Sequence, residues 1–219
     1  MPAPYESIVG GSADQCVVEI RPAVIGDLNA LVEICRLSFP GSLRWQGPRR
    51  IAARLWRRWL SSGSCRCWVC SRGMEVLGFV VFILDCDRYR AEAETRAVTS
   101  LDSAVLLMWH PLLAIKKAIS KLSLYRATPQ SVSVRKDMPN VLQKCTWIEL
   151  IAVRPDVQGR GLGAMMLEHC ATVTRTLGCE MVKLKVNKDN VQAFRAYERV
   201  GFEVTAEDAD AYTYTYLLK

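Results

Sequence analysis

Residues 147–178 of this 219-residue chain restrict the possible folds more than any other stretch. Residues 147–153 are almost all apolar, and so short an apolar run is typical of a buried strand. Pro155 ends the strand, because proline has no N–H for the ladder and disfavours helix at the preceding residue. From Leu162 apolar residues recur with the helical period, and Gly178 is well placed to end that helix. The stretch predicts a strand, a tight turn and a helix.

The turn, residues 158–163, reads QGRGLG. Its glycines permit positive φ and let a ligand approach the main chain closely. The free N–H groups and dipole of the following helix start, together with the charge of Arg160, would suit a phosphate or pyrophosphate. The spacing is not that of a Rossmann fingerprint, and no Lys-Ser/Thr follows as in a P-loop. A glycine-rich turn that binds no ligand is the alternative.

Two motifs here resemble those of the GCN5-related N-acetyltransferase (GNAT) family. Gln158-x-x-Gly161-x-Gly163 is similar to its acetyl-CoA-binding motif, Gln/Arg-x-x-Gly-x-Gly/Ala. The run from Asn190 to Phe202 resembles the family's terminal signature, with Ala193, Tyr197 and Gly201 at the matching positions. The motifs follow in the family's order and cover about residues 145 to 205. The N-terminal half agrees only in pattern, and residues 86–144 have no counterpart in the minimal family fold.

The resemblance implies a cofactor and the residues that hold it. The cosubstrate would be acetyl-CoA, and no metal is expected. In the family a splayed strand pairs with the pantetheine, and backbone amides of the glycine turn bind the pyrophosphate. The residues expected to bind the cofactor are Ile151, Ala152, Val153, Gln158, Gly159, Arg160, Gly161, Leu162, Gly163, Ala164 and Asn190. Asn190 would contact the pantetheine, cap the next helix, or do both.

Glu149 is the candidate general base. A carboxylate inside an apolar strand is costly to bury, and desolvation would raise its pKa toward a useful value. Strand alternation would place it on the same face as Val153, four residues later. Spermidine/spermine acetyltransferases, within the same family, have a glutamate at this offset that relays the amine proton through water. The alternative is a carboxylate that faces solvent.

Tyr197 is the candidate general acid. In the family a tyrosine at this place lies near the thioester sulfur and can protonate the leaving thiolate, whereas a core tyrosine is the alternative. The chain has two histidines. His169 falls on the core side of its helix and is expected to be structural, while His110, beside Pro111, could face the acceptor.

The remaining pattern predicts one α/β domain, residues 16–219, after a disordered tail of residues 1–15. Strands are expected at 17–21, 65–71, 75–85, 147–153, 180–186, 202–205 and 212–218. Helices are expected at 27–38 with Asp27 as cap, at 49–60, at 162–177 and at 191–200. This order gives a GNAT-like α/β/α sandwich with a central mixed, mostly antiparallel twisted sheet. A helical insertion at about 86–144 would separate the third and fourth strands.

The insertion and the second helix are rich in basic residues. Residues 101–124 carry a helical apolar pattern with lysines on one side. A packed helical hairpin, a lid over the acceptor site, a dimer contact and a surface resting on a membrane all remain open. In helix 49–60 five arginines accompany apolar residues, which suits either a solvated face or a wall of the acceptor site.

Composition limits the expected binding partners and the expected cellular location. The net charge is +7, but it is dispersed, so nucleic-acid binding is not expected. Nine cysteines scattered through apolar segments argue for a reducing, cytoplasmic location. Cys65-x-Cys67-x-x-Cys70 lacks a second ligand pair for zinc and suits a strand. No apolar run is long enough to span a membrane, and residues 1–15 lack the apolar core of an export signal.

The predicted activity is transfer of an acetyl group from acetyl-CoA to a primary amine, by direct attack in a ternary complex. The acceptor would be a small molecule, such as an amino sugar or sugar nucleotide, because basic residues near the insertion favour an anionic acceptor. A protein N-terminal or lysine acetyltransferase and a non-catalytic acyl-CoA-binding module are the alternatives. Either a monomer or a homodimer is compatible with the sequence.

Overall fold

The computed structural model describes residues 17–85, 89 and 145–218. The predicted tail, the insertion apart from Tyr89, the basic segment 101–124 and His110 therefore lie outside the described residues. Within the described part no helix has the length and apolar character needed to cross a membrane.

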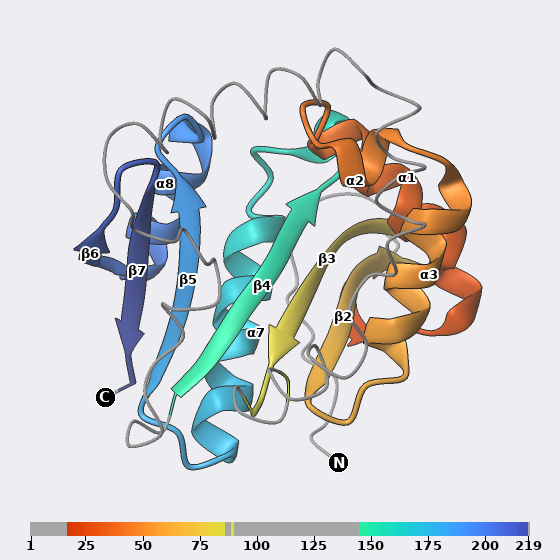
Figure 1. Ribbon diagram of the computed structural model, residues 1–219. Helices are drawn as coiled ribbons and strands as arrows, with labels where there is room; N and C mark the ends of the chain where they lie inside the picture. The colour runs from red at the N-terminus through yellow and green to blue at the C-terminus, as the bar shows by residue number, and fades with distance from the viewer. Residues whose placement is uncertain (1–16, 86–88, 90–144, 219) are drawn as a thin grey trace.

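A sheet of seven strands forms the centre of the fold, in the order β1-β2-β3-β4-β5-β7-β6 (Figure 1). Among the strands that the structure describes, β4 and β5 pair in parallel and the other neighbours are antiparallel. The mixed, mostly antiparallel sheet was predicted correctly. The strands are β1 (Val18–Pro22), β2 (Cys65–Arg72), β3 (Glu75–Ile83), β4 (Cys145–Val153), β5 (Met181–Asn187), β6 (Glu203–Glu207) and β7 (Ala211–Leu217).

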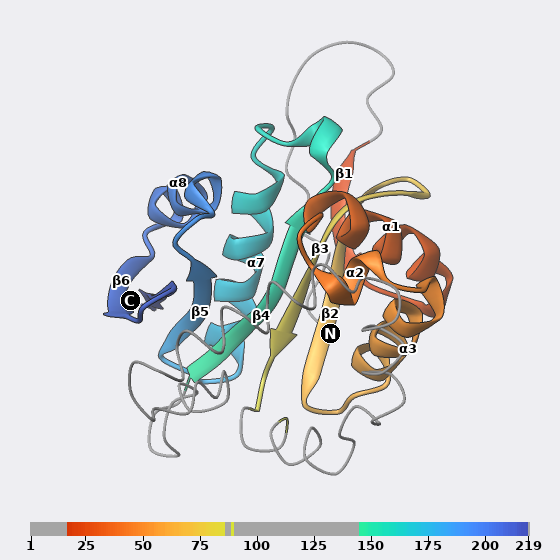
Figure 2. The same ribbon diagram turned by 45° about the horizontal axis from the view of Figure 1, so that its top comes forward.

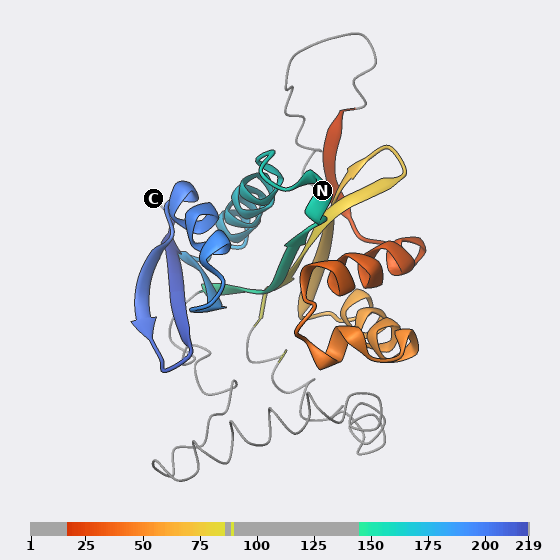
Figure 3. The same cartoon turned by 90° about the horizontal axis from the view of Figure 1, so that it is seen from above.

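Helices cover both faces of the sheet (Figure 3). One face carries α1 (Leu28–Ser38), α2 (Leu43–Gln46) and α3 (Arg49–Leu60). The other carries α7 (Leu162–Thr176) and α8 (Val191–Val200), which pack against each other (Figure 2). Short 3₁₀ turns, η1 (Ile25–Asp27) and η2 (Pro155–Val157), precede α1 and the glycine turn. The expected order of elements and the α/β sandwich are confirmed.

Each face of the sheet has its own apolar core. Beneath α3, Trp56 packs edge-on against Phe79 of β3, with ring centroids 4.7 Å apart, and Ala52 and Trp59 are buried beside it. These α3 positions follow helical spacing, so Arg50, Arg54 and Arg57 are left on the exposed side. Cys65, Cys67 and Cys70 are all buried on β2, as the strand interpretation requires.

The prediction that the Asp27 side chain caps helix α1 was wrong. Asp27 precedes α1, but its carboxylate makes no hydrogen bond to the first turn of that helix. It accepts two hydrogen bonds of 2.8 Å from Arg21 and one from the Val24 N–H. The hydrogen bonds from Arg21 are the main reason why the pKa of Asp27 lies below its usual value. The carboxylate therefore ties β1 to η1 because a guanidinium offers a stronger partner than a backbone amide.

Candidate functional site

The fourth and fifth strands separate part-way along their length. They pair from Cys145 with Met181 as far as Ile148 with Leu184. Beyond Ile148, β4 continues along β3 to Val153, whereas β5 continues along β7 to Asn187 (Figure 1). Among the described residues, no strand pairs with the end of β4 on its β5 side, so this divergence leaves an open main-chain edge there. Such an edge can hydrogen-bond an extended amide chain as a strand would.

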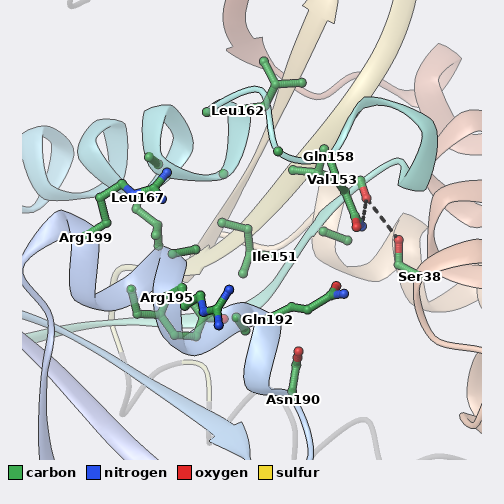
Figure 4. Close-up of a pocket in the computed structure, with 18 of the residues that line it drawn as sticks. Ser38, Ile151, Val153, Gln158, Leu162, Leu167, Asn190, Gln192, Arg195 and Arg199 are labelled. Carbon is green, nitrogen blue, oxygen red and sulfur yellow. Dashed lines mark hydrogen bonds between the residues drawn. The ribbon is translucent and has the colours of Figure 1, made fainter.

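A pocket of about 770 Å³ occupies this divergence and extends between α7 and α8 (Figure 4). The end of β4, the glycine turn and the first turns of α8 form its walls. Its lining residues are Ser38, Phe39, Ile151, Ala152, Val153, Val157, Gln158, Gly159, Gly161, Leu162, Gly163, Ala164, Leu167, Asn190, Val191, Gln192, Ala193, Arg195, Ala196, Tyr197 and Arg199. The structure thus brings the predicted cofactor residues together around one cavity, with the exception of Arg160.

The glycine turn presents a row of backbone donors to this pocket. Gly159 and Gly161 have φ values of 76° and 82°, which only glycine adopts at little cost. Among the described residues, the N–H groups of 159–164 have no hydrogen-bond partner, and Met165 is the first to donate, to Gly161. Because these donors lie at the start of α7, the helix dipole adds partial positive charge there. The arrangement suits an anion such as a pyrophosphate.

The carbonyl oxygen of Val153 is the point where β4, α1 and the turn meet. It accepts a hydrogen bond of 2.9 Å from Gln158 Nε2 and one of 3.4 Å from Ser38 Oγ (Figure 4). The side chain of Gln158 is therefore engaged with the protein, and its role at the pocket is to hold the turn against the end of β4. Sequence reasoning did not identify Ser38, because nothing local marks a serine at the end of a helix as a neighbour of β4.

Arg160 lies apart from the other turn residues. Its side chain is exposed and does not line the pocket. Its charge acts on Asp156, where it is one of the smaller causes that lower the pKa of that carboxyl group, after the hydrogen bond from Arg154. The donors that the turn presents to the pocket are therefore its backbone N–H groups.

Glu149 is the extra residue of a β-bulge. Ile148 pairs with Phe82, and Leu150 pairs with the adjacent Val81, so two steps along β4 correspond to one step along β3. As a result Ile148 faces the α7 core and Leu150 the opposite core, without the regular alternation. The inference that Glu149 shares a face with Val153 assumed that alternation, and the bulge removes its basis.

Glu149 is half-buried and does not line the pocket, but its charge acts on Tyr89. Burial, followed by the charge of Glu149, raises the pKa of Tyr89 to about 12. Tyr89 accepts a hydrogen bond of 3.2 Å from Trp59 Nε1 and packs against the α3 core. The carboxylate thus lies near the face covered by α1–α3, beside the divergence of β4 and β5.

Tyr197 lies at the wall of the pocket, on α8. It is 7% exposed, and its ring contacts those of Phe202 and Tyr214 at centroid distances of 6.1 Å and 5.6 Å. Burial raises the pKa of Tyr197 to about 12, so the hydroxyl group stays protonated at neutral pH. No hydrogen bond links this hydroxyl to another of the described residues. It can therefore donate to a group bound in the pocket.

Asn190 and His169 are the two remaining polar candidates among the described residues. Asn190 stands at the N-cap of α8, but its side chain makes no capping hydrogen bond and lies at the pocket wall (Figure 4). Asn190 therefore occupies the N-cap position, but its side chain does not cap the helix. His169 packs edge-on against Trp68, with ring centroids 4.4 Å apart, and burial lowers its pKa. His169 lies outside the pocket, as a structural histidine would.

The segment that forms most of the pocket is also the segment that resembles known proteins. The family model described as the acetyltransferase (GNAT) family matches residues 126–202, which include the end of β4, the glycine turn and Tyr197. Residues 126–202 belong to the GNAT family.

Curated GNAT relatives are similar over the same region. A mycothiol acetyltransferase of Mycobacteroides abscessus is 44% identical over 66 residues, which cover 28% of this chain and 21% of the relative. A ribosomal protein bS18-alanine N-acetyltransferase of Salmonella typhimurium is 46% identical over 52 residues, which cover 24% of this chain and 35% of the relative. The matches thus span only about a fifth to a third of these relatives' own length.

Solved acetyltransferase structures have a similar fold. The GNAT domain of S. lividans PAT superimposes with a TM-score of 0.62 at 15% identity, covering 100% of this chain and 99% of that domain. Spermidine N-acetyltransferase from Vibrio cholerae, in complex with CoA and spermine, has a TM-score of 0.56 at 13% identity, covering 92% of this chain and 95% of that one. At these identities the likeness concerns the fold alone.

Proposed function

We propose that this GNAT protein transfers the acetyl group of acetyl-CoA to the primary amine of a small molecule, by direct attack in a ternary complex. One observation carries the proposal: the edge of β4 and the free amides of the glycine turn line a single pocket. The edge fits the amide chain of pantetheine, and the turn fits the pyrophosphate. Relatives named mycothiol acetyltransferase, streptothricin acetyltransferase, ribosomal protein bS18-alanine N-acetyltransferase and peptidyl-lysine N-acetyltransferase support acetyl transfer.

In the proposed reaction the amine nitrogen attacks the thioester carbonyl carbon, a C–N bond forms and the C–S bond breaks. Main-chain N–H groups at the end of β4 would stabilise the developing oxyanion, which is often the largest catalytic contribution. Glu149 would accept the amine proton through water, since the pocket lining does not include its side chain. The CoA thiolate leaves along the pocket wall formed by Tyr197.

The pKa of Tyr197 refines its role. A hydroxyl group with a pKa of about 12 facing a thiolate of ordinary pKa, about 8.5, transfers its proton uphill by roughly 5 kcal/mol. Donation of a hydrogen bond carries no such penalty and still stabilises the departing sulfur. We therefore propose that Tyr197 donates a hydrogen bond to the leaving sulfur while solvent supplies the final proton.

None of the seven cysteines among the described residues forms a disulfide bond, and six of them are buried. Buried cysteines without disulfide bonds suit a reducing compartment, so we propose a cytoplasmic location. The choice of a small molecule over a protein acceptor rests on the sequence argument from basic residues.

Calorimetric titration of the purified chain with acetyl-CoA, CoA and NAD tests the proposal. We expect 1:1 binding of both CoA compounds and none of NAD. Mass spectrometry with acetyl-CoA and a panel of amines, amino sugars, sugar nucleotides and peptides then identifies the acceptor. Binding without acetylation of any acceptor would favour the non-catalytic module. A folded protein that binds no CoA compound would refute the proposal.

A further inference from the structure

Two arginines line the pocket on the side opposite the glycine turn. Arg195 and Arg199 lie four residues apart on α8, so their side chains project from the same face of that helix. Figure 4 shows Arg195 in the middle of the pocket and Arg199 near Leu167 of α7. Both side chains are exposed and can therefore reorient toward a ligand.

Three arginines in the described part of the chain are held by carboxylates. Arg21 is paired with Asp27, Arg49 with Glu33, and Arg154 with Glu75 and Asp156. By contrast, no ion pair or hydrogen bond to a described residue engages the guanidinium of Arg195 or Arg199.

The adjacent carboxylate does not neutralise them. Glu198 accepts a hydrogen bond from the hydroxyl group of Tyr214, at 3.3 Å, which draws it toward β7. Two uncompensated positive charges therefore remain on the α8 wall of the pocket. A cavity wall with such charges attracts an anion, and guanidinium groups suit phosphate oxygens because they can donate two parallel hydrogen bonds.

The glycine turn already accounts for one anionic group of the ligand. Its amides belong to the N-terminus of α7, whereas the arginines come from α8, so they are separate elements on facing walls. CoA carries a second anionic group, the 3′-phosphate of its ribose, a monoester with a charge near −2 at neutral pH. The charge of the two arginines and their paired guanidinium donors suit such a dianionic group.

We propose that Arg195 and Arg199 bind the 3′-phosphate of CoA, so that the protein selects CoA over 3′-dephospho-CoA. The inference rests on the proposed function, because it assumes that CoA occupies the pocket. It adds a second phosphate site to the one at the glycine turn and assigns it to α8.

The test compares two ligands that differ only in the 3′-phosphate. Calorimetry would give the Kd of CoA and of 3′-dephospho-CoA for the wild type, Arg195→Gln, Arg199→Gln and the double variant. Arg175→Gln is the matched control, because Arg175 is an exposed arginine near the end of α7 that does not line the pocket. Circular dichroism would check that each variant is folded.

We expect the wild type to bind CoA at least tenfold more tightly than 3′-dephospho-CoA. In the double variant the Kd of CoA should rise about tenfold or more, while that of 3′-dephospho-CoA stays within about twofold. Arg175→Gln should bind both ligands as the wild type does.

Three results would overturn the inference, and they are distinguishable. If the double variant weakens both ligands equally, the arginines contact a part of CoA that the two share. If it binds CoA as tightly as the wild type, they bind no phosphate. If the wild type binds neither ligand, the proposed function fails first, and the inference fails with it.

Discussion

Gly78 of β3 lies so close to β4 that a Cβ atom at this position would be 2.9 Å from the carbonyl oxygen of Ala152. The same atom would be 3.3 Å from the Cα of Val153. Both neighbours belong to the end of β4 that lines the pocket, and both are backbone atoms that cannot rotate away. The absence of a side chain at Gly78 therefore sets how closely β3 supports the wall of the site.

Replacing Gly78 by alanine is accordingly expected to affect stability and binding together. Gly78→Ala should lower the free energy of unfolding by about 1–3 kcal/mol, as overpacking does, and weaken acetyl-CoA binding by displacing residues 152–153. Urea denaturation and calorimetry measure the two effects. Gly41→Ala is the control, since a Cβ there meets no atom within 4 Å. Unchanged stability and affinity in Gly78→Ala would show that β4 is not restrained at this contact.

The two glycines at the start of α7 should respond differently to alanine. Gly161 has a φ of 82°, so Gly161→Ala should cost about 1–2 kcal/mol in stability and turn the backbone donors away from the pyrophosphate. Gly163 has no positive φ and no atom near its missing Cβ, so Gly163→Ala should leave stability unchanged or raise it by up to about 1 kcal/mol. Thermal unfolding compares them, and equal melting temperatures would contradict the assigned conformations.

Tyr197→Phe should reduce turnover without weakening cofactor binding. Loss of one hydrogen bond to the developing thiolate corresponds to a roughly 10- to 100-fold lower kcat, while the ring contacts with Phe202 and Tyr214 remain. Steady-state kinetics and the Kd of CoA separate the two quantities. A kcat equal to that of the wild type would exclude the proposed role.

The pH dependence gives an independent check on Tyr197. Because burial raises its pKa to about 12, the hydroxyl group stays protonated throughout the usual assay range. Tyr197 should therefore produce no decline in rate between pH 7 and about pH 10. A decline near pH 9 in the wild type that disappears in Tyr197→Phe would contradict the assignment.

Glu149→Gln tests the proposed base. The amide keeps the size of the side chain at the bulge but cannot accept the amine proton, so kcat/KM for the acceptor should fall about 100-fold or more. The KM for acetyl-CoA should change little, because the pocket lining does not include this side chain. A fall that is reversed at high pH, where the free amine is abundant, would agree with the role. A variant of normal activity would transfer the role of base to another group.

His169 should make stability depend on pH. Burial lowers the pKa of the folded-state imidazole below its ordinary value of about 6.5. Between these two pKa values the unfolded chain binds more protons than the folded one, so stability is greatest above about pH 6.5 and falls as the pH decreases toward the folded pKa.

The matched variant for that prediction is His169→Phe, which keeps an aromatic ring against Trp68 but cannot titrate. Urea denaturation at pH 7.5 and pH 5.5 should show a smaller loss of stability in the variant than in the wild type. An equal loss in both would mean that the histidine charges as easily in the folded as in the unfolded state.

The alternation of β4 shows where prediction from local pattern stops. The apolar composition of residues 147–153 was sufficient to predict a buried strand. The bulge at Glu149 was not predictable, because it depends on how Ile148 and Leu150 register against Phe82 and Val81 of another strand. Asp27 gives a second case, since its partner Arg21 is a better hydrogen-bond donor than the helix start beside it.

The sequence by itself determined the elements and the glycine turn, because helical and strand periods and the positive φ of Gly159 and Gly161 are local properties. It also carried the two motifs that indicate the GNAT family. Only the tertiary structure decided which side chains surround the cofactor pocket. Arg195 and Arg199 are indistinguishable in sequence from a solvated helix face until α8 packs beside α7. Ser38 joins the site because chain folding brings the end of α1 to Val153, 115 residues away. Such neighbours depend on packing between distant segments, which no local pattern encodes.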